Sequence, residues 1–482
     1  MIALHMNRTD YENDIRALLM AFFYGEKIVL DAVEWTQRLE VCYEDNKVMA
    51  ELTDREGKCE TGSVACDFAD YKETRNRIKR MVYSVLSAYT GQTLPWGTLT
   101  GIRPTKLPME LFENGAADEE TISYLKEKYL VSDKKAALCA EVARNEEAVL
   151  KGIEYGNTFS LYVGIPFCPS ICAYCSFSSY PLAVWEKEVD TYLDALEKEI
   201  EASASMMGEK KLLTFYMGGG TPTSLSASQM DRLLTCLEKY FNLSDARERT
   251  IEAGRPDSIS EDKLEVLKKH QISRISINPQ TMNQATLDLI GRKHTVQDIV
   301  DAFYMARKLG FENINMDLIA GLPGETSEHM RKTMDAIVEL RPDSVTVHSL
   351  ALKRAAFLNQ NREQFPVAPA DEVNRMIAIS HEGARAIQAE PYYLYRQKNI
   401  AGNLENVGYA RKGCEGLYNI LIMEEKQSIL ALGAGASSKF VFEGEGGSRI
   451  ERVENVKSVK DYIERIDEMI ARKKNFLAKI EK

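Results

Sequence analysis

A cluster of three cysteines constrains this chain more than any other feature of its sequence. Cys168, Cys172 and Cys175 follow the apolar run 161–165, which predicts a buried strand. Prolines on both sides of the first cysteine end regular structure there. The three thiols, spaced C-x3-C-x2-C, are therefore predicted to lie on a loop after a buried strand.

Thiols this close favour a bound metal centre. Thiolates repel one another unless a cation holds them, and an iron–sulfur cluster or a soft metal does so. A fully ligated cubane takes four cysteines, but Ser176 and Phe177 follow here, which leaves one iron open for chemistry. Structural zinc is an alternative, yet it takes four protein ligands and no second Cys or His pair lies nearby. Three unrelated buried cysteines are the other alternative, and the close spacing favours the cluster.

With its flanking residues, the stretch resembles the radical S-adenosylmethionine (SAM) superfamily and its branch of oxygen-independent coproporphyrinogen oxidases. The matching positions are Tyr162, the segment 165–168, and Tyr174 beside Cys175. The resemblance implies a [4Fe-4S] cluster on the three cysteines, with SAM chelated at the open iron. One electron from the cluster would then cleave SAM to methionine and a 5′-deoxyadenosyl radical.

A glycine-rich turn, Gly218-Gly-Gly-Thr-Pro-Thr, follows the next predicted strand. Without side chains a ligand can touch the backbone, and the first N–H groups of the following helix can hold a polar group. A plain tight turn is the alternative. The turn resembles the Gly-Gly-Gly-Thr-Pro motif of the family, which implies that Gly219, Gly220 and Thr221 line the methionine end of SAM.

Polar residues mark the ends of later strands. Glu252 and Asp317 are carboxylates in apolar surroundings, where burial requires a partner, and a SAM group or a plain ion pair would provide one. By resemblance, the expected SAM contacts are Tyr162, Tyr174, Gly219, Gly220, Thr221, Glu252, Gln280, Arg292, Asp317 and Ala351. No residue receives a catalytic role.

The chain departs from the family pattern at several positions. Arg255 stands where relatives commonly have Asn-Pro or Asp-Pro, and it is expected to face the substrate. Asn278 replaces a glycine, and Phe177 replaces the fourth cysteine of the better-defined oxidases. His294 is expected to be a loop histidine satisfied by hydrogen bonds rather than a catalytic group.

Strand and helix patterns alternate from about residue 158 to 380. The expected strands are 161–165, 212–217, 249–253, 272–277, 313–319 and 344–350, with amphipathic helices between them. Six βα units predict an α/β fold with a partial, open (β/α)6 barrel, and the resemblance implies the same core. Chemistry in such sheets sits at the carboxyl ends of the strands.

The pattern predicts three domains. Residues 1–152 form an α+β accessory domain, with a hairpin near 38–52 and helices at 71–89, 118–129 and 133–150. Residues 158–380 form the barrel. Residues 381–482 form a C-terminal accessory domain similar to that of the family, ending in an amphipathic surface helix.

Four further segments could contribute to binding. Arg103 and Lys106 lie on a Gly- and Pro-rich loop that either binds an anion or caps the barrel. The strip 392–403 either stacks on a flat ring or forms a domain interface, and 431–438 resembles a turn that closes over the site. Lys353 and Arg354 either meet propionates or are solvated charges.

Composition narrows the class of protein. The 482-residue chain has a net charge of −11, which disfavours a general nucleic-acid interface. No apolar run is long enough to span a bilayer and no secretory signal is visible, so a cytoplasmic protein is expected. The six remaining cysteines are scattered, as buried apolar residues are.

The whole-chain pattern is similar to a subgroup described as coproporphyrinogen III dehydrogenases. It implies oxidative decarboxylation of coproporphyrinogen III to protoporphyrinogen IX without oxygen, a step of heme biosynthesis. The implied partners are a tetrapyrrole substrate and reduced flavodoxin or ferredoxin as electron donor. Two alternatives stay open: a heme-binding chaperone of the same family, and a radical SAM enzyme that methylates or opens heme. Chaperone relatives carry a histidine-containing stretch that binds heme. The corresponding region of this chain has no histidine and reads Cys414-Glu-Gly-Leu-Tyr-Asn.

Overall fold

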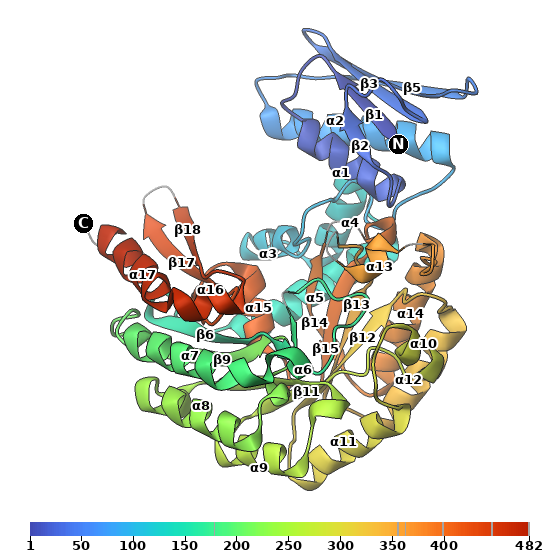
Figure 1. The fold of residues 1–482 in the computed structure, drawn as a ribbon. Coiled ribbons are helices and arrows are strands. Elements are labelled where there is room, and N and C mark those ends of the chain that lie inside the picture. The colour runs from blue at the N-terminus through green and yellow to red at the C-terminus, as the bar shows by residue number, and fades with distance from the viewer. Residues whose placement is uncertain (178, 354–355, 362, 398–399, 445–446, 481–482) are drawn as a thin grey trace.

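Parallel strands form the centre of the larger sheet (Figure 1). The computed structural model describes residues 1–177, 179–353, 356–361, 363–397, 400–444 and 447–480. The central strands are β6 (Thr158–Ile165), β9 (Lys211–Gly219), β10 (Glu248–Gly254), β11 (Arg274–Ile277), β12 (Ile314–Ala320) and β13 (Ser344–Ser349). Each pairs in parallel with its neighbour in chain order. The predicted α/β class with a partial (β/α)6 core is therefore confirmed.

Later segments extend this sheet at both edges. β16 (Ser428–Leu432) pairs in parallel with β6, and β15 (Glu405–Ala410) pairs antiparallel with β13. β14 (Glu390–Arg396) lies outside β15, while β17 (Ser437–Gly444) and β18 (Gly447–Glu454) lie outside β16. Residues beyond 380 thus add strands at both edges of the sheet that the predicted barrel strands form. The predicted boundaries at 152–158 and 380 stay predictions.

Helices cover the outer side of the sheet in an arc (Figure 1). Each presents one buried stripe, such as Met230, Leu233, Leu234 and Leu237 of α8. Capping boxes begin α8 at Ser226 and α11 at Thr295. The main covering helices are α7 (Val189–Ser203), α8 (Ala227–Tyr240), α9 (Glu261–Lys269), α11 (Val296–Lys308), α12 (Ser327–Leu340) and α14 (Ala370–Ala386).

The N-terminal region builds a second sheet with its own apolar core. Its strand order is β2-β1-β3-β4-β5, and the predicted hairpin is the antiparallel pair β3–β4, with Leu39 opposite Leu52. The predicted helix at 71–89 is α2. Elements here are β1 (Ile2–Met6), α1 (Glu12–Phe22), β2 (Ile28–Leu30), β3 (Gln37–Tyr43), β4 (Lys47–Asp54), β5 (Cys59–Ala65) and α2 (Tyr71–Thr90).

The loop after α2 packs on the barrel. Trp96 Nε1 donates to Glu405 Oε2 at 2.7 Å, and Arg396 donates to the Gly101 carbonyl. Arg103 pairs with the buried Glu424, so its guanidinium already has a partner. These contacts favour the capping role over anion binding. Helices α3 (Lys106–Glu113), α4 (Asp118–Tyr129) and α5 (Asp133–Leu150) follow.

The C-terminal tail forms two helices, α16 (Val459–Glu464) and α17 (Ile466–Ile480), rather than one surface helix. Lys473 of α17 is fully buried and pairs with Glu199 of α7, which is also fully buried. Glu199 accepts hydrogen bonds from Gly433 N at 2.8 Å and Tyr462 OH at 2.6 Å. Among the described helices, none combines the length and apolar character that crossing a membrane requires.

Candidate active site

The cysteine loop starts at the carboxyl end of β6. Cys168 lies in a short strand, β7 (Phe167–Cys168), which pairs with β8 (Tyr180–Pro181), so the prediction of three loop positions is wrong for this residue. Main-chain pairing with β8 continues past Pro166 because the Pro166 carbonyl accepts from Tyr180 N at 2.9 Å. Cys172 and Cys175 lie in the following turn, closed by Cys175 N donating to Cys172 O at 3.0 Å.

The thiols share a low-dielectric setting. Burial raises the pKa of Cys168 to about 11, and the neighbouring sulfurs of Cys175 and Cys172 add to the rise. At neutral pH the thiol therefore becomes a thiolate only where a metal replaces its proton. Among the described residues, no three His, Cys, Asp or Glu side chains converge on one metal ion. A cubane makes a different demand, because each thiolate bonds a separate iron.

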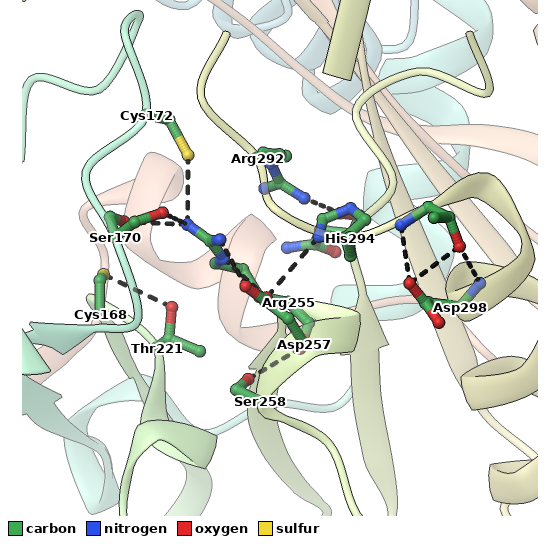
Figure 2. A network of polar contacts seen from close by, with 12 residues as sticks. Cys168, Ser170, Cys172, Thr221, Arg255, Asp257, Ser258, Arg292, His294 and Asp298 are labelled. Atoms are coloured by element: carbon green, nitrogen blue, oxygen red, sulfur yellow. Dashed lines mark hydrogen bonds and ion pairs between the residues drawn. The ribbon is translucent and has the colours of Figure 1, made fainter. Parts of the chain in front are cut away.

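The triple-glycine turn lies against this loop. Gly220 N donates to Ile165 O at 2.7 Å, and Thr221 N donates to Phe167 O at 2.8 Å. A Cβ on Gly220 would lie 2.6 Å from Phe167 O, and Gly219 has a φ of +105°. Thr221 Oγ1 donates to Cys168 Sγ at 3.4 Å (Figure 2). The predicted contacts Gly219, Gly220 and Thr221 are thus brought beside the first cysteine.

Gly220→Ala is expected to destabilise the protein by about 1–3 kcal/mol, because the methyl group meets rigid strand backbone. SAM affinity should fall with it, since the displaced backbone belongs to the cysteine loop. Urea unfolding and calorimetric titration with SAM would measure both. Gly156→Ala is the matched control, because a Cβ there has open space. Equal stability of both variants would contradict the close approach.

A cavity of about 210 Å³ opens beside the turn. Its walls come from β6, the cysteine loop, β9 and the turn after β16. The 431–438 segment therefore reaches the site, as the resemblance implies. Lining residues include Tyr162, Gly219, Phe177, Ala434, Gly435 and Lys457.

Three tyrosines stack beside the triple-glycine turn. Tyr162, Tyr216 and Tyr418 have ring centroids 4.5–6.3 Å apart and nearly parallel planes. Tyr216 OH donates to Glu252 Oε1. Burial raises the pKa of Glu252 to about 7, against the opposing effect of the Tyr216 hydrogen bond. Glu252 thus has a hydrogen-bond partner in Tyr216.

The remaining predicted contacts follow the next strands. Gln280 has a φ of +67°, and its N–H donates to Asp317 O at 2.9 Å. Arg292 donates to the Asn278 carbonyl and, at 3.2 Å, to Tyr174 OH. Ala351 bridges to Ile400 after β13. These positions surround the carboxyl ends of β11, β12 and β13, where the strand argument predicts the site.

The residues present fit SAM and a cluster. Ser276 Oγ, Asn278 Oδ1 and Arg292 Nε are buried without a hydrogen-bond partner in the described part of the chain. Unpaired buried polar atoms cost free energy, and the polar groups of SAM would pair them. The three cysteines supply the soft ligands that iron–sulfur clusters take.

Several side chains near the site are not among the residues predicted from the sequence. His348 Nδ1 lies 3.3 Å from Tyr395 OH, and its Nε2 lies 4.0 Å from Asp317 Oδ2. Burial lowers the pKa of His348. A histidine near the end of the strand predicted at 344–350 could have pointed to it, because chemistry gathers at strand ends. Tyr216 and Tyr418 had no comparable signal.

Arg255 contacts the cysteine loop, since its Nη1 donates to Ser170 O at 2.9 Å, and its expected position facing the substrate stays a prediction. The expectation that His294 is satisfied by hydrogen bonds is wrong. Neither ring nitrogen of the buried His294 has a hydrogen-bond partner among the described residues; Nδ1 lies 3.6 Å from Asp257 Oδ1. Both residues belong to one buried network (Figure 2).

The aromatic strip after residue 390 is largely buried. Tyr392, Tyr393 and Arg396 are 1%, 5% and 1% exposed, and Arg396 lies over the Trp96 ring. This favours the interface over stacking on a flat ligand. Lys353 is half-buried, whereas Arg354 lies outside the described residues.

Comparison with known proteins identifies the family. A family model described as the radical SAM superfamily matches residues 162–337. The oxygen-independent coproporphyrinogen-III oxidase-like protein HemZ of Bacillus subtilis is 42% identical over 414 residues, 85% of this chain and 82% of the relative. The heme chaperone HemW of the same organism is 33% identical over 312 residues, 64% of this chain and 76% of the relative.

A solved structure agrees with the sequence relatives. The coproporphyrinogen III oxidase HemN of Escherichia coli, described as a radical SAM enzyme, has a TM-score of 0.53 and 25% identity, covering 67% of this chain and 73% of its own. Radical SAM proteins use a [4Fe-4S] cluster and SAM. The three thiols, the glycine turn and the long match to HemZ agree. The chain therefore belongs to the radical SAM superfamily, in the family of HemN, HemZ and HemW.

Proposed function

We propose that this protein is a radical SAM oxidoreductase that converts coproporphyrinogen III to protoporphyrinogen IX without oxygen. The observation that supports this most is 42% identity to a coproporphyrinogen-III oxidase-like relative along 85% of the chain. The thiols and the glycine turn at the carboxyl ends of β6 and β9 agree with that chemistry.

The chain would divide cofactor binding between two groups of residues. Cys168, Cys172 and Cys175 would hold the cluster. When bound, the cofactors supply a carbon-centred radical that removes a hydrogen atom from the substrate. SAM would be held by Tyr162, Tyr174, Gly219, Gly220, Thr221, Glu252, Gln280, Arg292, Asp317 and Ala351.

The protein's own part is to bind, orient and exclude water. Each vinyl group forms when a propionate loses one hydrogen atom, one CO2 and one electron, and the electron passes to an acceptor. Lys457 lines the cavity and Lys353 follows β13, so either ammonium could pair with a propionate carboxylate. Reduced flavodoxin or ferredoxin would deliver the electron that starts each turnover, in the cytoplasm.

A heme chaperone is the second candidate. HemW is 33% identical over 64% of this chain, and Phe177 stands where the better-defined oxidases have a fourth cysteine. A chaperone would bind heme tightly and form little deoxyadenosine. Methyl transfer from SAM to heme would instead indicate a heme-modifying enzyme.

An anaerobic assay tests the proposal. The protein is reconstituted with iron and sulfide and given SAM, a reductant and coproporphyrinogen III. We expect 5′-deoxyadenosine and protoporphyrinogen to accumulate together, at two deoxyadenosines per protoporphyrinogen, because two propionates react in turn. Deoxyadenosine without vinyl products would refute the decarboxylase assignment, and tight heme binding in the same preparation would support the chaperone.

A further inference from the structure

Arg255 is the charged residue near the cysteines that the proposed function leaves without a role. It follows β10 directly, is 3% exposed, and its side chain runs to the cysteine loop (Figure 2). Its Nη1 donates to the carbonyl and the hydroxyl of Ser170, both at 2.9 Å, and to Cys172 Sγ at 3.6 Å. A buried cation therefore touches a sulfur that would ligate iron.

The guanidinium is fixed in this position. Nε and Nη2 donate to the two carboxylate oxygens of Asp257 at 2.9 and 2.6 Å, a bidentate pair. Arg255 and neighbouring His294 together hold the pKa of Asp257 below its usual range, so the carboxylate stays ionised. The five acceptor atoms of the guanidinium belong to three residues on two short segments, so the guanidinium cannot turn away from Cys172 without breaking the bidentate pair with Asp257.

Net charge and hydrogen bonds at the ligand sulfurs are among the factors that set the reduction potential of an iron–sulfur cluster. Reduction adds negative charge to the cluster and its thiolates. A cation beside one thiolate stabilises that added charge, and low-dielectric surroundings strengthen the effect. The negative charge of Asp257, which pairs with Nε and Nη2 of the same guanidinium, lowers the reduction potential instead.

We propose that Arg255 is a positioning residue that raises the reduction potential of the cluster by donating to Cys172 Sγ, with Asp257 as its opposing counter-charge. The inference rests on the cluster site of the proposed function, and it holds for any reaction that the reduced cluster starts. It makes electron entry easier in a protein whose cluster must be reduced before SAM is cleaved.

The test is a redox titration of the reconstituted cluster, followed by electron paramagnetic resonance of the reduced form. In Arg255→Gln we expect the equilibrium constant for reduction to fall about tenfold, a midpoint about 59 mV more negative for one electron. Asp257→Asn should move the midpoint in the positive direction, because it removes a negative charge. Arg255→Lys should restore part of the wild-type value.

Arg249→Gln is the matched control, since it removes the same charge at the amino end of the same strand. Its midpoint should equal that of the wild type. Opposite shifts for the Arg255 and Asp257 variants cannot come from simple loosening of the loop, which would move both the same way. Shifts of one sign, or none, at full iron content overturn the proposal.

Iron analysis separates the possible failures. If the wild-type chain takes up no iron, the cluster site itself fails and the proposal with it. If iron is bound but no vinyl product forms, only the decarboxylase assignment fails, and the potentials still decide the role of Arg255. If Arg255→Gln loses its iron, the direction of the midpoint shift in Arg255→Lys and in Asp257→Asn decides whether the proposal holds.

Discussion

Cys172→Ala is expected to leave a folded chain that binds no [4Fe-4S] cluster and does not cleave SAM. Two thiolates cannot hold a cubane that already lacks a fourth protein ligand. Cys172 is 7% exposed but lies on a loop, so its loss removes little packing. Because enzymic accelerations exceed about 10⁶-fold, deoxyadenosine formation should drop by at least ~10³-fold.

Iron analysis, the brown absorbance of the cluster and deoxyadenosine formation would measure this loss. Cys59→Ala is the control, since Cys59 is exposed in the N-terminal sheet and far along the chain from the site. It should keep full iron and activity. Full iron content in Cys172→Ala, or zinc in place of iron in the wild type, would contradict the ligand assignment.

Lys473→Met is expected to destabilise the protein by about 3–5 kcal/mol, because it leaves the buried Glu199 carboxylate without its cation. Lys473 Nζ also donates to Asn455 Oδ1 at 2.8 Å, and Asn455 Nδ2 donates to Glu199 Oε1 and to Gly433 O. Loss of the lysine should therefore also disturb the turn after β16, which lines the cavity. Urea unfolding and SAM titration would report the two effects.

The double variant Glu199→Gln with Lys473→Met tests the charge argument. Glutamine keeps an oxygen for Gly433 N and Tyr462 OH but carries no charge. The double variant should be more stable than Lys473→Met alone. If it is less stable, the pair matters through packing and not through an unpaired charge.

The sequence predicts most of the barrel because buried parallel strands read as continuous apolar runs. The run at 313–319, for example, becomes β12 (Ile314–Ala320) with Asp317 at its centre. The cysteine and glycine motifs likewise point to neighbouring strand ends. Their proximity follows from topology, since β6 and β9 are paired in parallel.

Other features depend on contacts that have no local signal. Nothing in the pattern around Lys473 distinguishes it from the solvated lysines beside it, yet it is fully buried against a helix 274 residues earlier. One partner of Arg255 is the sulfur of Cys172, 83 residues away in the sequence. His294 was expected to be satisfied, because short sequence patterns do not record which buried atoms lack partners.

The pairing of β16 with β6 has a consequence for how the protein is made. Leu161 and Leu430 are neighbours in the sheet, so the strand that leads into the cysteine loop has an open edge until residues 428–432 are synthesised. A nascent chain on the ribosome thus exposes unpaired main-chain groups beside its metal ligands. We therefore expect the cysteine loop to be fully supported only after β16 has paired with β6.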